Sequence, residues 1–310
     1  MKKRIRFIDL FAGIGGFHLA FHDLGAECVL ACEKDEYARE TYKFNFNEIS
    51  PKIFNHNNFP DDIQKITNDV SLIPEFDILC AGFPCQPFSQ AGYKKGFSES
   101  LENRGNMFFQ IYQIIKHKKP EAYFLENVRH LRNHNDGKTF TVIRDALEEL
   151  GYSFHYKVVK ASDYGLPQHR PRIFMVGFKN EKTFDSEFSF PEAIPLKMDM
   201  SDIFKGNCNK KIGYTLRVGG RGSGLNDRRN WDTYLVNGKV VRISSREGKK
   251  MMGFPDSFLF PVSETQAMKQ LGNSVAVPAV RATAEKILQY VELSNLDTNR
   301  NYYKKAANFG

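Results

Sequence analysis

The 310-residue sequence has no run of about eighteen or more apolar residues, the length that a membrane-spanning helix requires. Its first residues enter a strand-like stretch at residues 5–10, so we expect no signal peptide. The five cysteines show neither disulfide nor metal-ligand spacing, which predicts reduced thiols and no metal site. With 41% apolar residues, the chain can nevertheless bury a sizeable core.

The net charge of +8 is unevenly distributed along the chain. Residues 205–250 contain twelve Lys or Arg and three Asp or Glu, a net +9, so the rest of the chain carries about −1. A basic segment in an otherwise balanced chain is typical of a protein that binds a polyanion such as nucleic acid. On charge alone, a merely solvated basic surface remains the alternative.

The first 180 residues alternate between strand-like and helix-like patterns. The expected strands are residues 4–11, 27–32, 76–82, 122–126, 152–159 and 172–178, and the expected helices are residues 15–24, 36–47, 106–117 and 139–150. This alternation predicts an α/β fold with a doubly wound, mostly parallel sheet. Because no long helix separates the last two strands, we expect one of them to be antiparallel.

The pattern becomes polar and irregular after the last of these strands. Residues 181–263 are rich in Gly, Asn and Lys, which predicts a small, irregular second domain. A helical pattern returns at Glu264, is interrupted at residues 272–275, and gives way to an expected polar tail at residues 299–310. We therefore expect one large domain made of residues 1–180 and 264–310.

A glycine-rich loop joins the first expected strand to the first expected helix. It contains Phe11, Gly13, Ile14 and Gly16, and such loops let a backbone approach a ligand closely at the end of a strand. The Lys-Ser/Thr pair of a P-loop is absent. Glu33 ends the second strand, where a carboxylate can accept both hydroxyls of a ribose; an exposed strand-end acid is the alternative.

A second set of residues predicts covalent chemistry. Cys85 follows Pro84 directly after a buried strand, a place suited to presenting a sulfur, although a single loop cysteine is most often inert. Glu126 ends the neighbouring strand, and a nucleophilic sulfur beside a carboxyl group suits addition to an electron-poor ring. Arg170 and Arg172 alternate along a strand, so both can hold an oxygen of that ring or order Glu126.

In their order and spacing these motifs resemble the cytosine-5 DNA methyltransferase family of the bacterial restriction–modification type, over nearly the whole chain. The resemblance implies S-adenosylmethionine as cofactor. It implies that Cys85 adds to C6 of a cytosine flipped out of duplex DNA, while Glu126 engages N3. The implied cofactor contacts are Phe11, Gly13, Ile14, Gly16, Glu33, Asp62, Ile63, Pro84, Asn273 and Ser274.

The resemblance also implies where DNA is recognised. The family's recognition region is short here, so residues 217–231, after the Thr215–Leu216 pair, are expected to carry most of the sequence choice. The expected DNA contacts are Gln86, Ser89, Thr215, Arg217, Arg221, Arg228 and Arg229. For the last three arginines, reading guanine edges and contacting phosphates are equal alternatives. A cytoplasmic bacterial enzyme is implied, paired with a restriction endonuclease and without a membrane partner; one catalytic domain per chain permits a monomer.

Three other functions compete with this interpretation. A nicotinamide-dependent oxidoreductase would use the glycine loop, but it leaves the Cys85 motif and the basic segment unexplained. A tRNA cytosine methyltransferase would be expected to carry a Cys-Phe-Thr element, which this sequence lacks. A DNA-binding protein that has lost catalysis is disfavoured by the presence of Cys85, Glu126 and Arg172.

Overall fold

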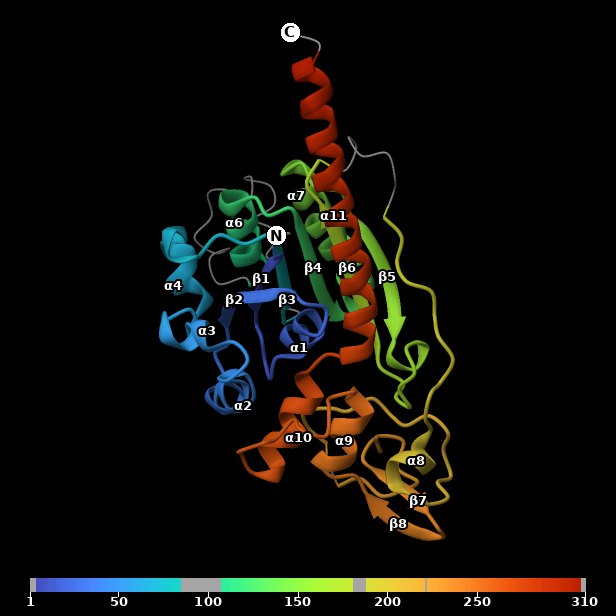
Figure 1. Cartoon of the computed structure of the whole chain (residues 1–310). Helices are drawn as coiled ribbons and strands as arrows, with labels where there is room; N and C mark the ends of the chain where they lie inside the picture. The colour runs from blue at the N-terminus through green and yellow to red at the C-terminus, as the bar shows by residue number, and fades with distance from the viewer. Residues whose placement is uncertain (1–3, 85–106, 181–187, 221, 308–310) are drawn as a thin grey trace.

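The computed structural model describes residues 4–84, 107–180, 188–220 and 222–307, with side chains to residue 293 (Figure 1). Four predicted site residues, Cys85, Gln86, Ser89 and Arg221, lie outside the described residues. Within the described part of the chain, no helix combines the length and apolarity that a bilayer crossing requires.

The centre of the molecule is a six-stranded sheet with the order β2-β1-β3-β4-β6-β5. The strands are β1 (Arg6–Leu10), β2 (Glu27–Cys32), β3 (Ile78–Gly82), β4 (Ala122–Val128), β5 (His155–Lys160) and β6 (Pro171–Phe178). Neighbours among β2, β1, β3 and β4 are parallel, whereas β6 runs antiparallel to both β4 and β5. The expected doubly wound, mostly parallel sheet with one antiparallel strand is therefore confirmed.

The strand order reverses at β1, because β2 lies on one side of it and β3 on the other. In sheets of this kind, ligands bind beyond the carboxyl ends of the strands at such a reversal. The chain at residues 58–60 extends the sheet beyond β2 without forming a named strand. Its carbonyl oxygens at Asn58 and Pro60 accept hydrogen bonds from the amides of Ala31 (2.9 Å) and Glu33 (3.3 Å).

Helices cover both faces of the sheet, as the alternation of side chains in β1 requires. Phe7 belongs to a core cluster with residues of α1 (Gly16–His22), α2 (Glu36–Phe46) and α11 (Val277–Ala307). Ile8 and Leu10 belong to a second cluster on the opposite face. The helices that contribute to this second cluster are α4 (Ile63–Asn68), α6 (Met107–Lys118) and α7 (Lys138–Glu149).

A group of short elements lies at one end of the sheet (Figure 1). It contains α8 (Met200–Phe204), β7 (Thr233–Val236), β8 (Lys239–Arg242), α9 (Ser245–Met252) and α10 (Glu264–Asn273). Asn237 and Gly238 both adopt positive φ between β7 and β8, as a tight hairpin turn requires. In Figure 1, α10 lies with this group while α11 runs back along the sheet, so the domain boundary before residue 264 stays a prediction.

Helix α9 begins at a capping box and ends at a glycine. The Ser244 backbone N–H donates to the Glu247 carboxylate (2.9 Å), and the Ser244 hydroxyl in turn accepts from the Arg246 amide, so side chains satisfy the exposed amides of the first turn. Gly253 ends the helix at φ +76°, the left-handed conformation that favours glycine.

Two sequence-based boundaries were wrong. β5 begins at His155 instead of residue 152, because Tyr152 only bridges to Lys179 and donates its hydroxyl hydrogen to the Pro120 carbonyl (2.6 Å). The expected polar tail at residues 299–310 is instead helical as far as Ala307. Neither Pro nor Gly interrupts the sequence between residues 279 and 309, and polarity alone does not distinguish an exposed helix from a tail.

Candidate active site

The carboxyl ends of β1, β2, β3 and β4 open into a cleft of about 840 Å³. Its other walls include residues 61–64, residues 215–218 and the end of α10. Twelve of the predicted site residues line it: Phe11, Gly13, Ile14, Glu33, Asp62, Ile63, Pro84, Glu126, Arg172, Thr215, Arg217 and Asn273. The structure therefore brings together residues that are up to 262 positions apart in the sequence.

Glu126 lies near the end of β4 and is 8% exposed. The Arg172 Nε donates a hydrogen bond to its Oε1 at 2.9 Å. The contact is diagonal across two antiparallel strands, since Arg172 pairs in register with Val128, two residues beyond Glu126. Burial raises the pKa of the Glu126 carboxyl, and the charges of Arg172 and Arg170 only partly oppose this effect. Glu126 is thus suited to holding and donating a proton.

Asn127 fixes the backbone that leads to Cys85. Its Nδ2 donates to the Phe83 carbonyl (2.9 Å), and its side chain is 2% exposed. Gly82 pairs in register with Glu126, so β3 and β4 end side by side. No role for Asn127 was predicted from the sequence, where the available signal was its position directly after Glu126 at a strand end. Cys85 itself lies outside the described residues.

Arg170 and Arg172 have different surroundings despite their alternation in sequence. Arg170 is 1% exposed, and its guanidinium donates to the carbonyls of Leu216 (3.1 Å), Gly272 (2.8 Å) and Ser274. It therefore links the chain directly before β6, the residue before the 217–231 segment and the α10–α11 junction. The hydrogen bond to Glu126 comes from Arg172, and only Arg172 lines the cleft.

Glu33 connects the end of β2 to the glycine loop. Its Oε2 accepts from the Gly13 amide (2.8 Å) and its Oε1 from the Asp35 amide (2.7 Å). A carboxylate offers about four acceptor sites, so about two remain for a ligand. Gly15 has φ +84°, and a Cβ there would lie 2.2 Å from the Phe46 ring, so this loop position requires glycine.

Two further parts of the cleft wall come from opposite ends of the chain. Asp62 caps α4 through its Oδ1, which accepts from the Gln64 amide (2.9 Å), and Ile63 is buried beside it. Across the cleft wall, Lys269 of α10 pairs with Asp35 at the start of α2 (2.9 Å). This cross-link was not predicted, because nothing in either local sequence indicates a partner 234 positions away.

The α10–α11 junction packs against the glycine loop. A Cβ on Gly16 would lie 2.5 Å from Val275 and 3.4 Å from the Ser274 hydroxyl oxygen. The Ser274 hydroxyl is buried and, among the described residues, has no hydrogen-bond partner. The predicted cofactor residues Gly16 and Ser274 thus lie together just behind the cleft, and Asn273 lies on its wall.

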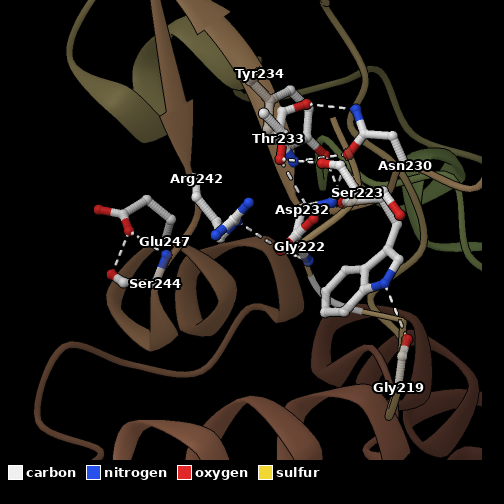
Figure 2. A network of polar contacts seen from close by, with 11 residues as sticks. Gly219, Gly222, Ser223, Asn230, Asp232, Thr233, Tyr234, Arg242, Ser244 and Glu247 are labelled. Atoms are coloured by element: carbon white, nitrogen blue, oxygen red, sulfur yellow. Dashed lines mark hydrogen bonds and ion pairs between the residues drawn. The ribbon is translucent and has the colours of Figure 1, made fainter. Parts of the chain in front are cut away.

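Four consecutive side chains hold the 217–231 segment in shape (Figure 2). Three of the side chains donate to backbone carbonyls: Asn230 Nδ2 to Leu225 (3.3 Å), Trp231 Nε1 to Gly219 (3.0 Å) and the Thr233 hydroxyl to Ser223 (3.1 Å). The fourth, Asp232, accepts through its Oδ2 from the Gly222 amide (3.2 Å). Asp232 is fully buried and also pairs with Arg242 of β8 at 3.1 Å. These contacts fix the backbone at residues 219, 222, 223 and 225 against residues 230–233.

Four of the predicted DNA contacts, Thr215, Arg217, Arg228 and Arg229, lie in or next to this segment among the described residues. Thr215 donates its hydroxyl hydrogen to the His169 carbonyl, and Arg217 is exposed on the cleft wall. Arg228 is exposed. Arg229 is also exposed, but Asp227 holds its guanidinium through two hydrogen bonds. Which of these arginines meet bases and which meet phosphates stays a prediction.

Comparison with known proteins identifies the family. The model for C-5 cytosine-specific DNA methylase matches residues 5–219 and 215–289. The type II methyltransferase M.SsoII of Shigella sonnei is 41% identical over 325 residues, covering 93% of this chain and 81% of the relative. M.HhaI of Haemophilus parahaemolyticus is 38% identical over 337 residues, covering 96% of each chain.

Solved structures agree on the fold. A Spodoptera frugiperda DNMT2 mutant has a TM-score of 0.67 at 20% identity, over 93% of this chain and 99% of that chain. The S. pombe Dnmt2 methyltransferase has a TM-score of 0.65 at 18% identity, over 95% and 99%. The family match also removes the oxidoreductase alternative, because it accounts for the glycine loop and the Cys85 motif together. On this combined evidence, the chain belongs to the family of C-5 cytosine-specific DNA methylases.

Proposed function

We propose that this protein is the DNA (cytosine-5-)-methyltransferase of a restriction–modification system. It transfers a methyl group from S-adenosylmethionine to C5 of a cytosine flipped out of a specific duplex sequence, through a covalent Cys85 adduct. The observation that carries this proposal is the buried Glu126–Arg172 pair in the cleft, beside the end of β3 from which the chain leads to Cys85.

The residues around the cleft fit the proposed cofactor. Its volume of about 840 Å³ lies in the range of small-molecule sites. Glu33 retains acceptor capacity for ribose hydroxyls, and Ile63 offers an apolar wall for a purine ring. The unpartnered Ser274 hydroxyl near Gly16 is a further polar group on this side. When bound, S-adenosylmethionine supplies an electrophilic methyl group.

The protein's own groups account for the activation of the cytosine. The Cys85 thiolate forms a bond to C6, and the Glu126 carboxyl gives a proton to N3, so that the ring electrons become available at C5. Arg172 keeps Glu126 oriented through its hydrogen bond. Methyl transfer to C5 leaves S-adenosylhomocysteine. Solvent water then takes the C5 proton, the C5–H electron pair re-forms the C5–C6 double bond, and the C6–S bond breaks to release the Cys85 thiolate. N3 returns its proton to the Glu126 carboxylate, which restores the aromatic ring and the starting enzyme.

The basic part of the chain provides the DNA-binding surface. Residues 205–250 carry a net +9, and residues 217–218 lie on the wall of the cleft, so a duplex held by this part presents its bases to Glu126. We assign the chemistry to residues 1–180 and 264–310 and the recognition to residues 181–263. The type II names of the relatives support pairing with a cognate endonuclease.

The proposal is tested by incubating the protein with plasmid DNA and S-adenosylmethionine and mapping 5-methylcytosine by sequencing. We expect methylation at one short recurring sequence, and none with Cys85→Ser, because a hydroxyl is far less ionised than a thiol. Methylation of transfer RNA in place of the plasmid would favour the RNA-modifying alternative. Cofactor binding without any methyl transfer would favour a DNA-binding protein that has lost catalysis.

A further inference from the structure

Asp227 and Arg229 form a two-point contact on the surface of the 217–231 segment. The Arg229 Nε donates to Asp227 Oδ1 at 3.2 Å, and its Nη2 donates to Oδ2 at 2.9 Å. The arginine side chain is 78% exposed, so the contact does not serve to bury the guanidinium. An exposed ion pair of this kind contributes little to the free energy of folding. Stability therefore does not explain why the two side chains meet through two hydrogen bonds.

The contact leaves the other edge of the guanidinium open. Arginine has five N–H donors in a planar fork, and Asp227 uses the edge formed by Nε and Nη2. Both Nη1 hydrogens and the second Nη2 hydrogen remain, and in the described part of the chain they have no hydrogen-bond partner. This outer edge presents two parallel donors, the arrangement that matches O6 and N7 of guanine in the major groove.

The turn beneath this pair is held in one conformation. The Asp227 Oδ1 also accepts from the Arg229 amide (2.8 Å), and the Asn230 amide donates to the Asp227 carbonyl (2.9 Å). Asn230 is itself buried in the network of Figure 2, and the adjacent Trp231 holds Gly219, next to the cleft-lining Val218. Arg229 therefore projects from a fixed base that is connected to the cleft wall.

Charge distinguishes the two classes of DNA contact. The Asp227–Arg229 pair carries no net charge, and Asp227 would be repelled by a phosphate placed against Arg229. A guanine edge has no net charge and offers two acceptors, so it fits the open edge without this repulsion. The neighbouring Arg228 is exposed and, among the described residues, has no such acidic partner, as expected for a phosphate contact.

We propose that Asp227 is a specificity-determining residue that orients Arg229 to read one guanine of the recognised sequence, whereas Arg228 contacts phosphate. This inference rests on the proposed function, because it assumes a DNA substrate with a preferred sequence. The pair limits the rotamers of Arg229, so less conformational entropy is lost when the base is contacted.

The test uses the full-length protein and a set of duplexes in which each base pair of the methylated sequence is varied singly. Methyl transfer is measured for the wild type, Arg229→Ala, Asp227→Asn and the double variant, with Arg228→Ala as the matched control. Asn at position 227 still accepts from the Arg229 amide and favours the same turn, so only the side-chain pairing is weakened.

We expect Arg229→Ala to lower discrimination at one G·C pair by about 10- to 100-fold. Asp227→Asn should lower discrimination at that same pair by about two- to fivefold, and should add nothing in the Arg229→Ala background. Arg228→Ala should weaken all duplexes alike and reduce the salt slope by about one.

Equal losses on every duplex for Arg229→Ala would overturn base reading by this residue. Unchanged discrimination in Asp227→Asn, or an effect at a different base pair, would overturn the role of Asp227. A wild-type protein that methylates no duplex DNA would overturn the proposed function and this inference together, and it is recognised before any variant is measured.

Discussion

The active-site cleft and the 217–231 segment are both held by polar contacts, but the contacts differ in the number of sequence positions that they span. Asn127, which lines the cleft, reaches 44 positions to Phe83, and the buried Arg170 reaches 102 positions to Gly272 on the cleft wall. In the segment, Trp231 reaches 12 positions to Gly219, and Asp227 only two to Arg229. The cleft therefore exists only when the whole sheet is assembled, whereas most of the segment's shape comes from within it or next to it.

This difference predicts two kinds of mutational response. Changes in the cleft should alter chemistry or global stability while leaving the choice of DNA sequence intact. Changes in the segment should alter sequence choice while leaving the chemistry intact. For Glu126→Gln and Trp231→Phe both the turnover and the sequence preference are measured, so a variant that changes both quantities would contradict this division.

The largest effect is expected from Glu126→Gln. Glutamine can donate a hydrogen bond to a ring nitrogen but cannot transfer a proton to it, so turnover should fall by about two to four orders of magnitude. The preference among DNA sequences should not change. Single-turnover methylation with tritiated cofactor measures the rate, and a rate close to wild type would show that Glu126 is only a structural acid.

Arg170→Met should chiefly destabilise the fold. The substitution leaves the carbonyls of Leu216, Gly272 and Ser274 without their buried donor, at a cost of about 3–5 kcal/mol in the free energy of unfolding. Urea denaturation gives this value, with the exposed Arg228→Met as control at about 0.5 kcal/mol or less. A stable, fully folded but inactive Arg170→Met would instead support the catalytic role expected from the sequence.

Glu33→Ala should weaken the binding of S-adenosylmethionine by very roughly 10- to 100-fold, since a charged hydrogen bond is worth about 1.5–3 kcal/mol. DNA affinity should stay nearly constant. Calorimetric titration of the cofactor decides the matter, and an unchanged dissociation constant would leave Glu33 only its contacts to the Gly13 and Asp35 amides.

The raised pKa of Glu126 predicts a pH dependence. In the proposed mechanism the protonated carboxyl is the acid, so above its folded-state pKa the protonated fraction falls about tenfold per pH unit. Because this pKa is raised from 4.5, the group favours folding at low pH, and that contribution is lost as the pH rises through the folded-state value. Single-turnover rates should show an alkaline decline that is absent in Glu126→Gln; the same decline in both would assign it to another group.

The smallest effect is expected from Trp231→Phe. It removes one hydrogen bond to Gly219, worth about 0.5–1.5 kcal/mol, and keeps most of the buried ring area. Turnover on the preferred sequence should stay within a few-fold of wild type, while discrimination against single-base variants decreases. If turnover fell and discrimination did not, the segment would be part of the chemical site.

The sequence was most informative where side chains follow strand ends. Parallel strands bring their carboxyl ends to one edge, so the positions of Phe11, Glu33, Pro84 and Glu126 in one cleft were predictable from the order of the strands alone. The different hydrogen-bond partners of Arg170 and Arg172 were not predictable. Their alternation predicts that both side chains share one face of a strand, but it does not predict which groups lie opposite them. The Asp35–Lys269 pair depends on the path of α10, which no local pattern encodes.

For the 217–231 segment, the sequence predicted the kind of partner but not the shape of the backbone. Its charge and glycine content identified it as a candidate DNA contact, but the shape depends on Asn230, Trp231 and Asp232, which read in sequence as ordinary polar and aromatic residues. Composition predicts that a segment binds, whereas side-chain bonds to specific carbonyls and amides determine how it presents its arginines.

The start of the 217–231 segment contacts the α10–α11 junction through main-chain atoms, and this affects which of its positions can accept substitutions. A Cβ on Gly272 would lie 2.6 Å from the Arg217 carbonyl carbon, and Arg170 holds the Leu216 carbonyl. These contacts engage main-chain atoms, so they are indifferent to the side chains at positions 217 and 218. Substitutions at positions 217 and 218 should therefore change the surface offered to DNA without disturbing these contacts, whereas substitution of Gly272 or Arg170 should displace the backbone of the segment.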